Sequence, residues 1–157
     1  MKGKSRKRFF ALFVVALLAV CVLGACGSKN MSKEEYIEEV NKLNTVSEEF
    51  FNAMTEWVGN AMAMDTEEAK AGVEEMREIT KGYGEVAAIE NPPKEYAEIH
   101  KKLVEGLNGL VDALDKYFDS LISGLDGAPL SDEEQLAVQT DVMDSITDIA
   151  ALLEEIQ

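Results

Sequence analysis

The chain has 157 residues, with 30 acidic and 15 basic side chains and a formal net charge of −15 at pH 7. Its length suits one domain with a core of its own. The acidic balance argues against nucleic-acid binding, which needs clustered Lys and Arg side chains to neutralise phosphates.

The N-terminus has the layout of a secretory signal peptide. Five basic residues within positions 2–8 precede an uncharged apolar run, Phe9 to Leu23, and small residues then lead to a cysteine. That order is typical of a cleaved leader. The run has 15 residues, whereas a single membrane span needs roughly 20, which disfavours the alternative of an uncleaved transmembrane helix. We therefore expect residues 1–25 to be removed.

Residues 23–26, Leu-Gly-Ala-Cys, resemble a bacterial lipobox, in which signal peptidase II cuts before a cysteine that carries a diacylglyceryl group. The resemblance implies an exported lipoprotein, anchored to the extracytoplasmic face of the cell membrane through a lipid on Cys26. Two acyl chains anchor stably, because each buried methylene contributes roughly 0.8 kcal/mol and one chain alone is marginal. Residues 26–31 are then a tether, and the five residues after Cys26 reach at most about 18 Å.

Processing also changes the chemistry of the mature chain. Cys21 leaves with the leader and Cys26 is lipidated, so no disulfide, free thiol or thiolate metal ligand remains. The five leader bases leave as well, so 10 basic residues face 30 acidic ones and the formal charge is −20. A solvated surface is the simplest interpretation of this charge, and an acidic docking face for a cationic partner or metal is the alternative.

Four segments of the mature chain have apolar residues at helical spacing. The first, residues 32–63, opens with a Ser-x-x-Glu capping box from Ser32. The second starts at Asp65 and ends around Gly82 and Gly84, each of which costs about 1 kcal/mol inside a helix relative to alanine. We expect a kink or fraying at these glycines.

The sequence Asn-Pro-Pro at 91–93 separates the second helix from the third, because the residue before a proline avoids the α region. The third helix carries two neighbouring apolar stripes and should face two other helices. A loop over 124–129 precedes a second Ser-x-x-Glu box, from Ser131, that opens the fourth helix. Together these segments predict an all-α, antiparallel up-down-up-down four-helix bundle over residues 32–157.

Pro92, Pro93, Tyr96 and His100 lie at the start of the third predicted helix. This pattern is similar to that of small helical lipoproteins of Gram-positive bacteria, many of which have no assigned activity. The resemblance implies a helical fold and a membrane location, and it carries no catalytic residues.

His100 is the only histidine of the chain. The Glu-x-x-His pair of di-iron bundles is absent, because residue 97 is alanine. No second histidine can complete a zinc site. We interpret His100 as a packed or rim side chain, with a ligand role as the alternative, and we expect neither a metal nor a cofactor.

Aspartates recur at helical spacing on the third and fourth helices: Asp112, Asp115, Asp119, Asp141, Asp144 and Asp148. Carboxylate oxygens suit Ca²⁺, but neither row has the loop spacing of an EF-hand. We interpret both rows as solvated outer faces.

One level of the predicted bundle combines methionines with missing side chains. The residues at this level are Met54, Trp57, Gly72, Met76, Gly106 and Met143. Flexible methionines around two glycines can leave a pocket for a small apolar ligand. Close helix packing, with the methionines filling gaps, is the simpler alternative.

Catalysis finds little support, because the mature chain has no cysteine nucleophile and no glycine-rich phosphate loop. Two functions remain for a protein that we expect not to be an enzyme. The first is a membrane-tethered module that binds another envelope protein, which predicts a filled core and an exposed apolar or acidic patch. The second is a carrier or sensor of a small apolar or amphipathic ligand, which predicts a cavity of about 300 Å³ or more.

Overall fold

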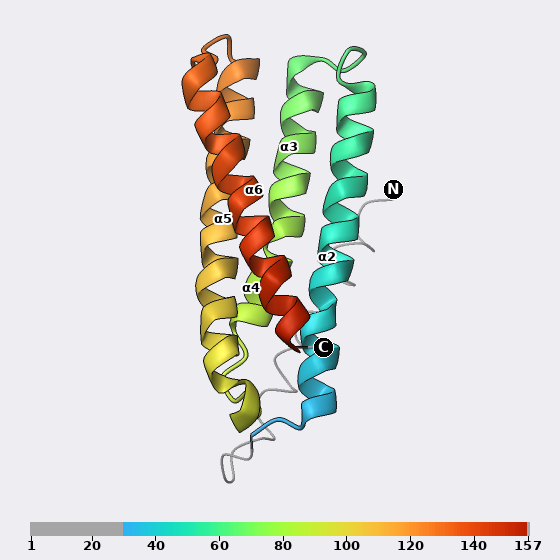
Figure 1. The fold of residues 1–157 in the computed structure, drawn as a ribbon. Coiled ribbons are helices and arrows are strands. Elements are labelled where there is room, and N and C mark those ends of the chain that lie inside the picture. The colour runs from blue at the N-terminus through green and yellow to red at the C-terminus, as the bar shows by residue number, and fades with distance from the viewer. Residues whose placement is uncertain (1–29, 157) are drawn as a thin grey trace, which may run out of the picture. The chain divides into compact units, whose positions relative to one another are not determined.

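The computed structural model describes residues 30–156, so the predictions about the leader, the lipobox and Cys26 fall outside the described residues. Within the compact unit Met31–Gln157, the described residues form helices and no strand (Figure 1). In chain order these are α2 (Lys33–Asn60), α3 (Thr66–Thr80), α4 (Gly82–Ala87), the 3₁₀ turn η1 (Lys94–Tyr96), α5 (Ala97–Leu125) and α6 (Asp132–Ile156). Only one residue separates α3 from α4, so the two together form one interrupted helix and the bundle has four helical units. The predicted all-α four-helix bundle is therefore confirmed. No helix among residues 30–156 has the length and apolar character needed to cross a membrane.

Capping boxes start three of the helices. At α2, the Ser32 side chain accepts a hydrogen bond from the Glu35 amide at 3.2 Å, and the Glu35 carboxylate accepts one from the Ser32 amide at 2.9 Å. The pairs Asp65–Glu68 and Ser131–Glu134 repeat this exchange at the starts of α3 and α6. Each box satisfies two amides that a helix start otherwise leaves unpaired, so these short motifs fix where the helices begin.

The interrupted helix breaks at Lys81, between α3 and α4. The buried Thr80 donates its hydroxyl to the carbonyl oxygen of Arg77 at 2.9 Å, a local bond that competes with regular helix geometry. Gly82 then lies directly against α2, where an added Cβ would come within 2.6 Å of Val46 Cγ2. Glycine at this position allows the close approach of the two helices, and the predicted kink is confirmed.

The core forms around α5, which has seven buried residues and packs against α3, α4 and α6. The prediction that this helix faces more than one neighbour is therefore confirmed. The largest fully buried side chains come from α2, α3, α4 and α5: Tyr36, Val73, Met76, Val86, Leu103, Leu107, Leu114 and Phe118.

The last helix, α6, buries fewer residues than the other long helices. Only Ile149 and Ile156 of α6 are buried. The helix packs along α5 but approaches α2 much less closely, and Figure 1 shows its C-terminal half running obliquely across the bundle. The side of the bundle between α2 and α6 is therefore the least closed.

Candidate functional site

His100 is buried at the end of the bundle where the chain enters α2. Its Nε2 lies 3.0 Å from the carbonyl oxygen of Ile89, which can only accept, so Nε2 carries the proton. Nδ1 then accepts a hydrogen bond from the Tyr36 hydroxyl at 3.1 Å. Because both ring nitrogens have hydrogen-bond partners, this geometry supports a packed rather than a metal-binding histidine.

Tyr36 connects this histidine to the turn before α5. Its ring stacks on Tyr96 with centroids 5.2 Å apart, and it meets the His100 ring edge-on at 5.5 Å. Burial raises the pKa of Tyr36 to about 12. The Met31 amide also donates to the carbonyl oxygen of Asn91 at 2.9 Å. These contacts tie the start of α2 to the Asn-Pro-Pro turn, and we interpret them as structural.

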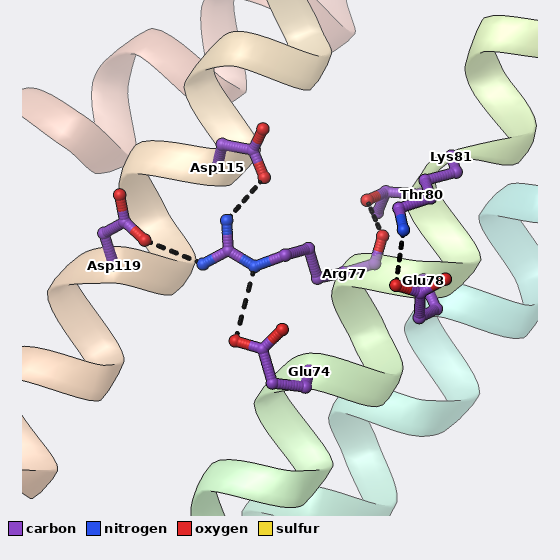
Figure 2. A network of polar contacts seen from close by, with 7 residues as sticks. All are labelled: Glu74, Arg77, Glu78, Thr80, Lys81, Asp115 and Asp119. Atoms are coloured by element: carbon purple, nitrogen blue, oxygen red, sulfur yellow. Dashed lines mark hydrogen bonds and ion pairs between the residues drawn. The ribbon is translucent and has the colours of Figure 1, made fainter.

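Two aspartates of the third predicted helix bind an arginine. Arg77 of α3 donates from Nη1 to Asp115 Oδ1 at 2.7 Å and from Nη2 to Asp119 Oδ1 at 2.8 Å (Figure 2). The guanidinium lies 5.4 Å from the centroid of the Phe118 ring, and Nε lies 3.6 Å from Glu74 Oε1. The Asp115 side chain stays half-exposed and that of Asp119 exposed, in keeping with the predicted solvated face, and both also link α3 to α5 through Arg77.

The remaining aspartates line a solvent-open hollow between α5 and α6. Asp112, Asp141, Asp144 and Asp148 share it with Lys116. Across the part of the chain that the structure describes, no three His, Cys, Asp or Glu side chains are placed to hold a metal ion. This hollow is an acidic, solvated surface.

The six residues of the predicted ligand layer do not surround one cavity. Trp57 fills the space beside Gly72, since an added Cβ there would lie 2.4 Å from Trp57 Cδ1. The same indole donates from Nε1 to the carbonyl oxygen of Ala69 at 2.8 Å. Gly106 faces α6 instead, where an added Cβ would lie 3.2 Å from Ile149 Cγ1.

The three methionines of that layer are also separated. Met76 is fully buried, Met54 is half-buried against the core, and Met143 is exposed. The sequence predicted one shared level for these residues, but their burial differs from fully buried to exposed. This arrangement favours close helix packing, with methionines filling gaps, over a ligand pocket at this level.

Trp57 and Gly72 do border a hollow of about 550 Å³ on the α2–α3 face. It opens to solvent, and three carboxylates line it: Glu49, Glu56 and Glu75. Burying these charges under an apolar molecule would be costly. This hollow is therefore a poor candidate for an apolar ligand.

A smaller apolar cavity of about 160 Å³ lies between α2, α4, α5 and α6. Its walls include Phe50, Phe51, Leu110, Leu114, Ile146 and Ala150. Two of its polar atoms, the hydroxyls of Ser47 and Tyr83, bond each other at 3.1 Å. The sequence pattern did not reveal this cavity, because it arises from the oblique path of α6 past α2.

Phe51 lines the cavity, and further exposed apolar side chains lie along α2 and α6, two of the helices that border it. On α2, Phe51 is 53% exposed and Val58, seven residues later, is 61% exposed. On α6, Met143 is 61% exposed and Leu136 is 65% exposed, again seven residues apart. Seven residues are two helical turns, about 10.5 Å, so each pair lies on one flank of its helix. We call the cavity and these four side chains the α2–α6 groove.

No protein-family model, curated protein or solved structure matches this chain. A four-helix bundle hosts many unrelated functions, so the fold alone names none. The groove, the charge of the helices beside it and the N-terminal sequence are the features from which function is argued.

Proposed function

We propose that this protein is a membrane-anchored extracytoplasmic lipoprotein that binds another envelope protein through the α2–α6 groove and catalyses no reaction. The lipobox-like sequence at 23–26 supports the anchor. The observation that carries the binding function is a set of four large exposed apolar side chains: Phe51 lines the apolar cavity, and Val58, Leu136 and Met143 lie further along the two helices that border it.

Apolar residues scattered singly over a surface are ordinary in soluble proteins. Large apolar side chains gathered at a hollow are instead typical of interaction sites. Covering them with a partner removes apolar surface from water, which contributes about 25 cal/mol for each Å² covered. The groove therefore offers binding energy that the free protein does not use.

The alternative, a carrier of a small apolar or amphipathic ligand, has weaker support. Pockets for such ligands measure about 300 Å³ or more. The apolar cavity of the groove is about 160 Å³, and the larger α2–α3 hollow is open and lined by three glutamates. The cavity is instead of a size that one side chain of a protein partner can fill.

The absence of catalysis is proposed from the surroundings of the groups that commonly perform it. His100 is buried, and both of its ring nitrogens are engaged by Tyr36 and Ile89. Tyr83 and Ser47, the hydroxyls at the groove, bond each other amid mostly apolar walls. The Tyr36 hydroxyl does donate to His100, but both side chains are buried away from solvent, where no substrate reaches them. The residues that line the cavity around Ser47 and Tyr83 include no His, Asp, Glu or Lys that could act as a base.

A photoreactive amino acid in place of Met143 tests the binding function in cells that make the protein. We expect irradiation to attach one envelope protein, identified by mass spectrometry. The matched control carries the same amino acid at Ala151, an exposed position on the outer flank of α6. Equal crosslinking from both positions, or none from Met143, would contradict the proposal.

The anchor has its own test. Cys26→Ser should abolish incorporation of a fatty-acid label and move the protein out of the membrane fraction. Cys21→Ser is the control and should change neither result, because Cys21 lies within the leader. A Cys26→Ser protein that is still labelled would refute lipidation at this residue.

A further inference from the structure

We infer that the α2–α6 groove accepts a basic amphipathic helix of the partner, with one phenyl-sized side chain of that helix inserted in the cavity. The inference rests on the proposed function and names the chemistry of the surface that the groove recognises. Three observations carry it: the volume of the cavity, the spacing of the exposed apolar residues and the distribution of charge.

The volume selects a single large side chain. An engineered cavity of about 150 Å³ lined by Leu, Ile and Phe side chains binds benzene in another protein. The cavity here is about 160 Å³, and its walls include Phe50, Leu110, Leu114 and Ile146. The same chemistry and size suit the ring of one phenylalanine or the branched end of one leucine. An acyl chain or a larger ligand exceeds this space.

The spacing selects a helix. Phe51 and Val58 on α2, and Leu136 and Met143 on α6, repeat at two helical turns along the groove. An amphipathic helix presents its own apolar residues at i, i+3, i+4 and i+7, and such helices commonly bind in apolar grooves between helices. A partner helix can therefore run along these residues, and the side chain that enters the cavity lies towards one of its ends, because the α6 wall of the cavity begins at Ile146, beyond Leu136 and Met143.

The charge selects a basic helix. Residues 43–60 of α2 contain three glutamates and no Lys or Arg, and α6 contains eight acidic residues and no basic one. Lys42, just before this stretch, already pairs with Glu39. Among residues 30–156, none of the ion pairs uses a carboxylate of α6. The two helices beside the groove therefore carry a surplus of negative charge, although Glu49 and Glu56 line the α2–α3 hollow and three aspartates of α6 line the α5–α6 hollow.

Some of these carboxylates lie at the groove itself. Glu48 is exposed one turn before Phe51, and Glu154 is exposed one turn after Ala150, which lines the cavity. Basic side chains flanking the partner's apolar stripe meet these carboxylates, and such complementarity speeds association and excludes wrong partners. A second copy of this chain brings the same negative charge, and so does an anionic lipid surface.

A synthetic peptide tests the inference with the full chain in phosphatidylcholine nanodiscs. The probe has about 18 residues, five helical turns, with a leucine stripe, one phenylalanine in an end turn of that stripe and lysines on the other face. We expect fluorescence anisotropy to show micromolar binding. Replacing the lysines by glutamate, or the phenylalanine by alanine, should weaken binding at least about tenfold.

Filling the cavity is the decisive change. Ala150→Leu should weaken binding of the peptide at least about tenfold, while Ala151→Leu, one position along α6, should leave it unchanged. Met143→Lys is a second variant at an exposed site, and it should weaken binding by charge repulsion. Ala137→Lys is its control, because Ala137 is exposed and lies about 120° around the helix from Met143. Circular dichroism checks that each variant keeps its helices.

Equal affinity of the Ala150→Leu protein, or of the glutamate peptide, would overturn the inference. So would a dimer in sedimentation experiments that Ala150→Leu dissociates, because a second copy would then occupy the groove. If no peptide binds but crosslinking from Met143 still captures an envelope protein, the basic-helix inference fails and the proposed function stands. If the peptide does not bind and crosslinking from Met143 captures no envelope protein, both the basic-helix inference and the proposed function are rejected.

Discussion

The contact between Tyr36 and His100 can be tested by removing the Tyr36 hydroxyl and measuring how the loss of stability depends on pH. Tyr36→Phe removes the hydroxyl that donates to Nδ1 of the buried His100. A buried acceptor left without its partner costs about 1–3 kcal/mol. We therefore expect the free energy of unfolding of the Met31–Gln157 unit to fall by that amount at pH 8.

At high pH the difference in stability between the two proteins should shrink. The pKa of Tyr36 is raised to about 12 by burial, from an ordinary value of 10.0. A raised pKa means that the neutral form is favoured in the folded state, so this stabilisation is complete below pH 10 and is lost as the pH rises towards 12. About one pKa unit of this stabilisation is lost by pH 11, which corresponds to about 1.4 kcal/mol. The phenylalanine variant has no such ionisation, so the difference in stability between the two proteins should narrow by about that amount.

Urea unfolding followed by circular dichroism at pH 8, 10 and 11 measures both effects. Tyr117→Phe is the control for removal of a tyrosine hydroxyl, because no hydrogen bond of the Tyr117 hydroxyl is seen in the described structure. It should change stability little at pH 8. A stability difference between wild type and Tyr36→Phe that stays constant from pH 8 to pH 11 would refute the reasoning, as would the absence of any loss at pH 8.

Three further changes test the packing. Gly72→Ala should destabilise the protein by about 1–2 kcal/mol, because the added Cβ meets Trp57. Gly109→Ala should stabilise it by about 0.5–1 kcal/mol, because nothing lies within 4 Å of the added Cβ. Equal melting temperatures of the two variants would contradict this contrast. Arg77→Lys should cost about 1 kcal/mol, because an ammonium does not bridge two carboxylates as a guanidinium does, and the loss should shrink in 1 M salt. Ala150→Leu should raise the stability of the free protein by about 0.5–2 kcal/mol by filling the cavity, and a lower urea midpoint would count against the cavity.

The sequence predicted features that depend on residues close together in the chain. The Ser32 capping box, its counterpart at Ser131 and the kink next to Gly82 all arise within one or two turns. Periodicity likewise identified the apolar faces, since Leu103, Leu107 and Leu114 are buried as their spacing requires. Local features of this kind are enough to predict a helical bundle from the sequence.

Contacts between helices were predicted less well, because they depend on which flank of each helix meets its neighbour. Arg77 and Asp115 are 38 positions apart, and nothing in either local sequence marks them as a pair. Met54 and Met143 share a predicted height, yet one lies against the core and the other in solvent. The α2–α6 groove depends on the oblique path of α6, which residue spacing does not encode.

The sparse burial of α6 has an energetic consequence. Only two of its residues are buried, and Glu154 and Glu155 stand at its C-terminus, where the helix dipole disfavours negative charge. Because so few of its residues are buried, we expect this helix to have the smallest free energy of local opening among the long helices of the bundle. A cationic helix bound along it would both neutralise that end and hold it closed. Docking and the ordering of α6 are then thermodynamically coupled, so that occupancy of the groove is reported by the amide exchange of a single helix.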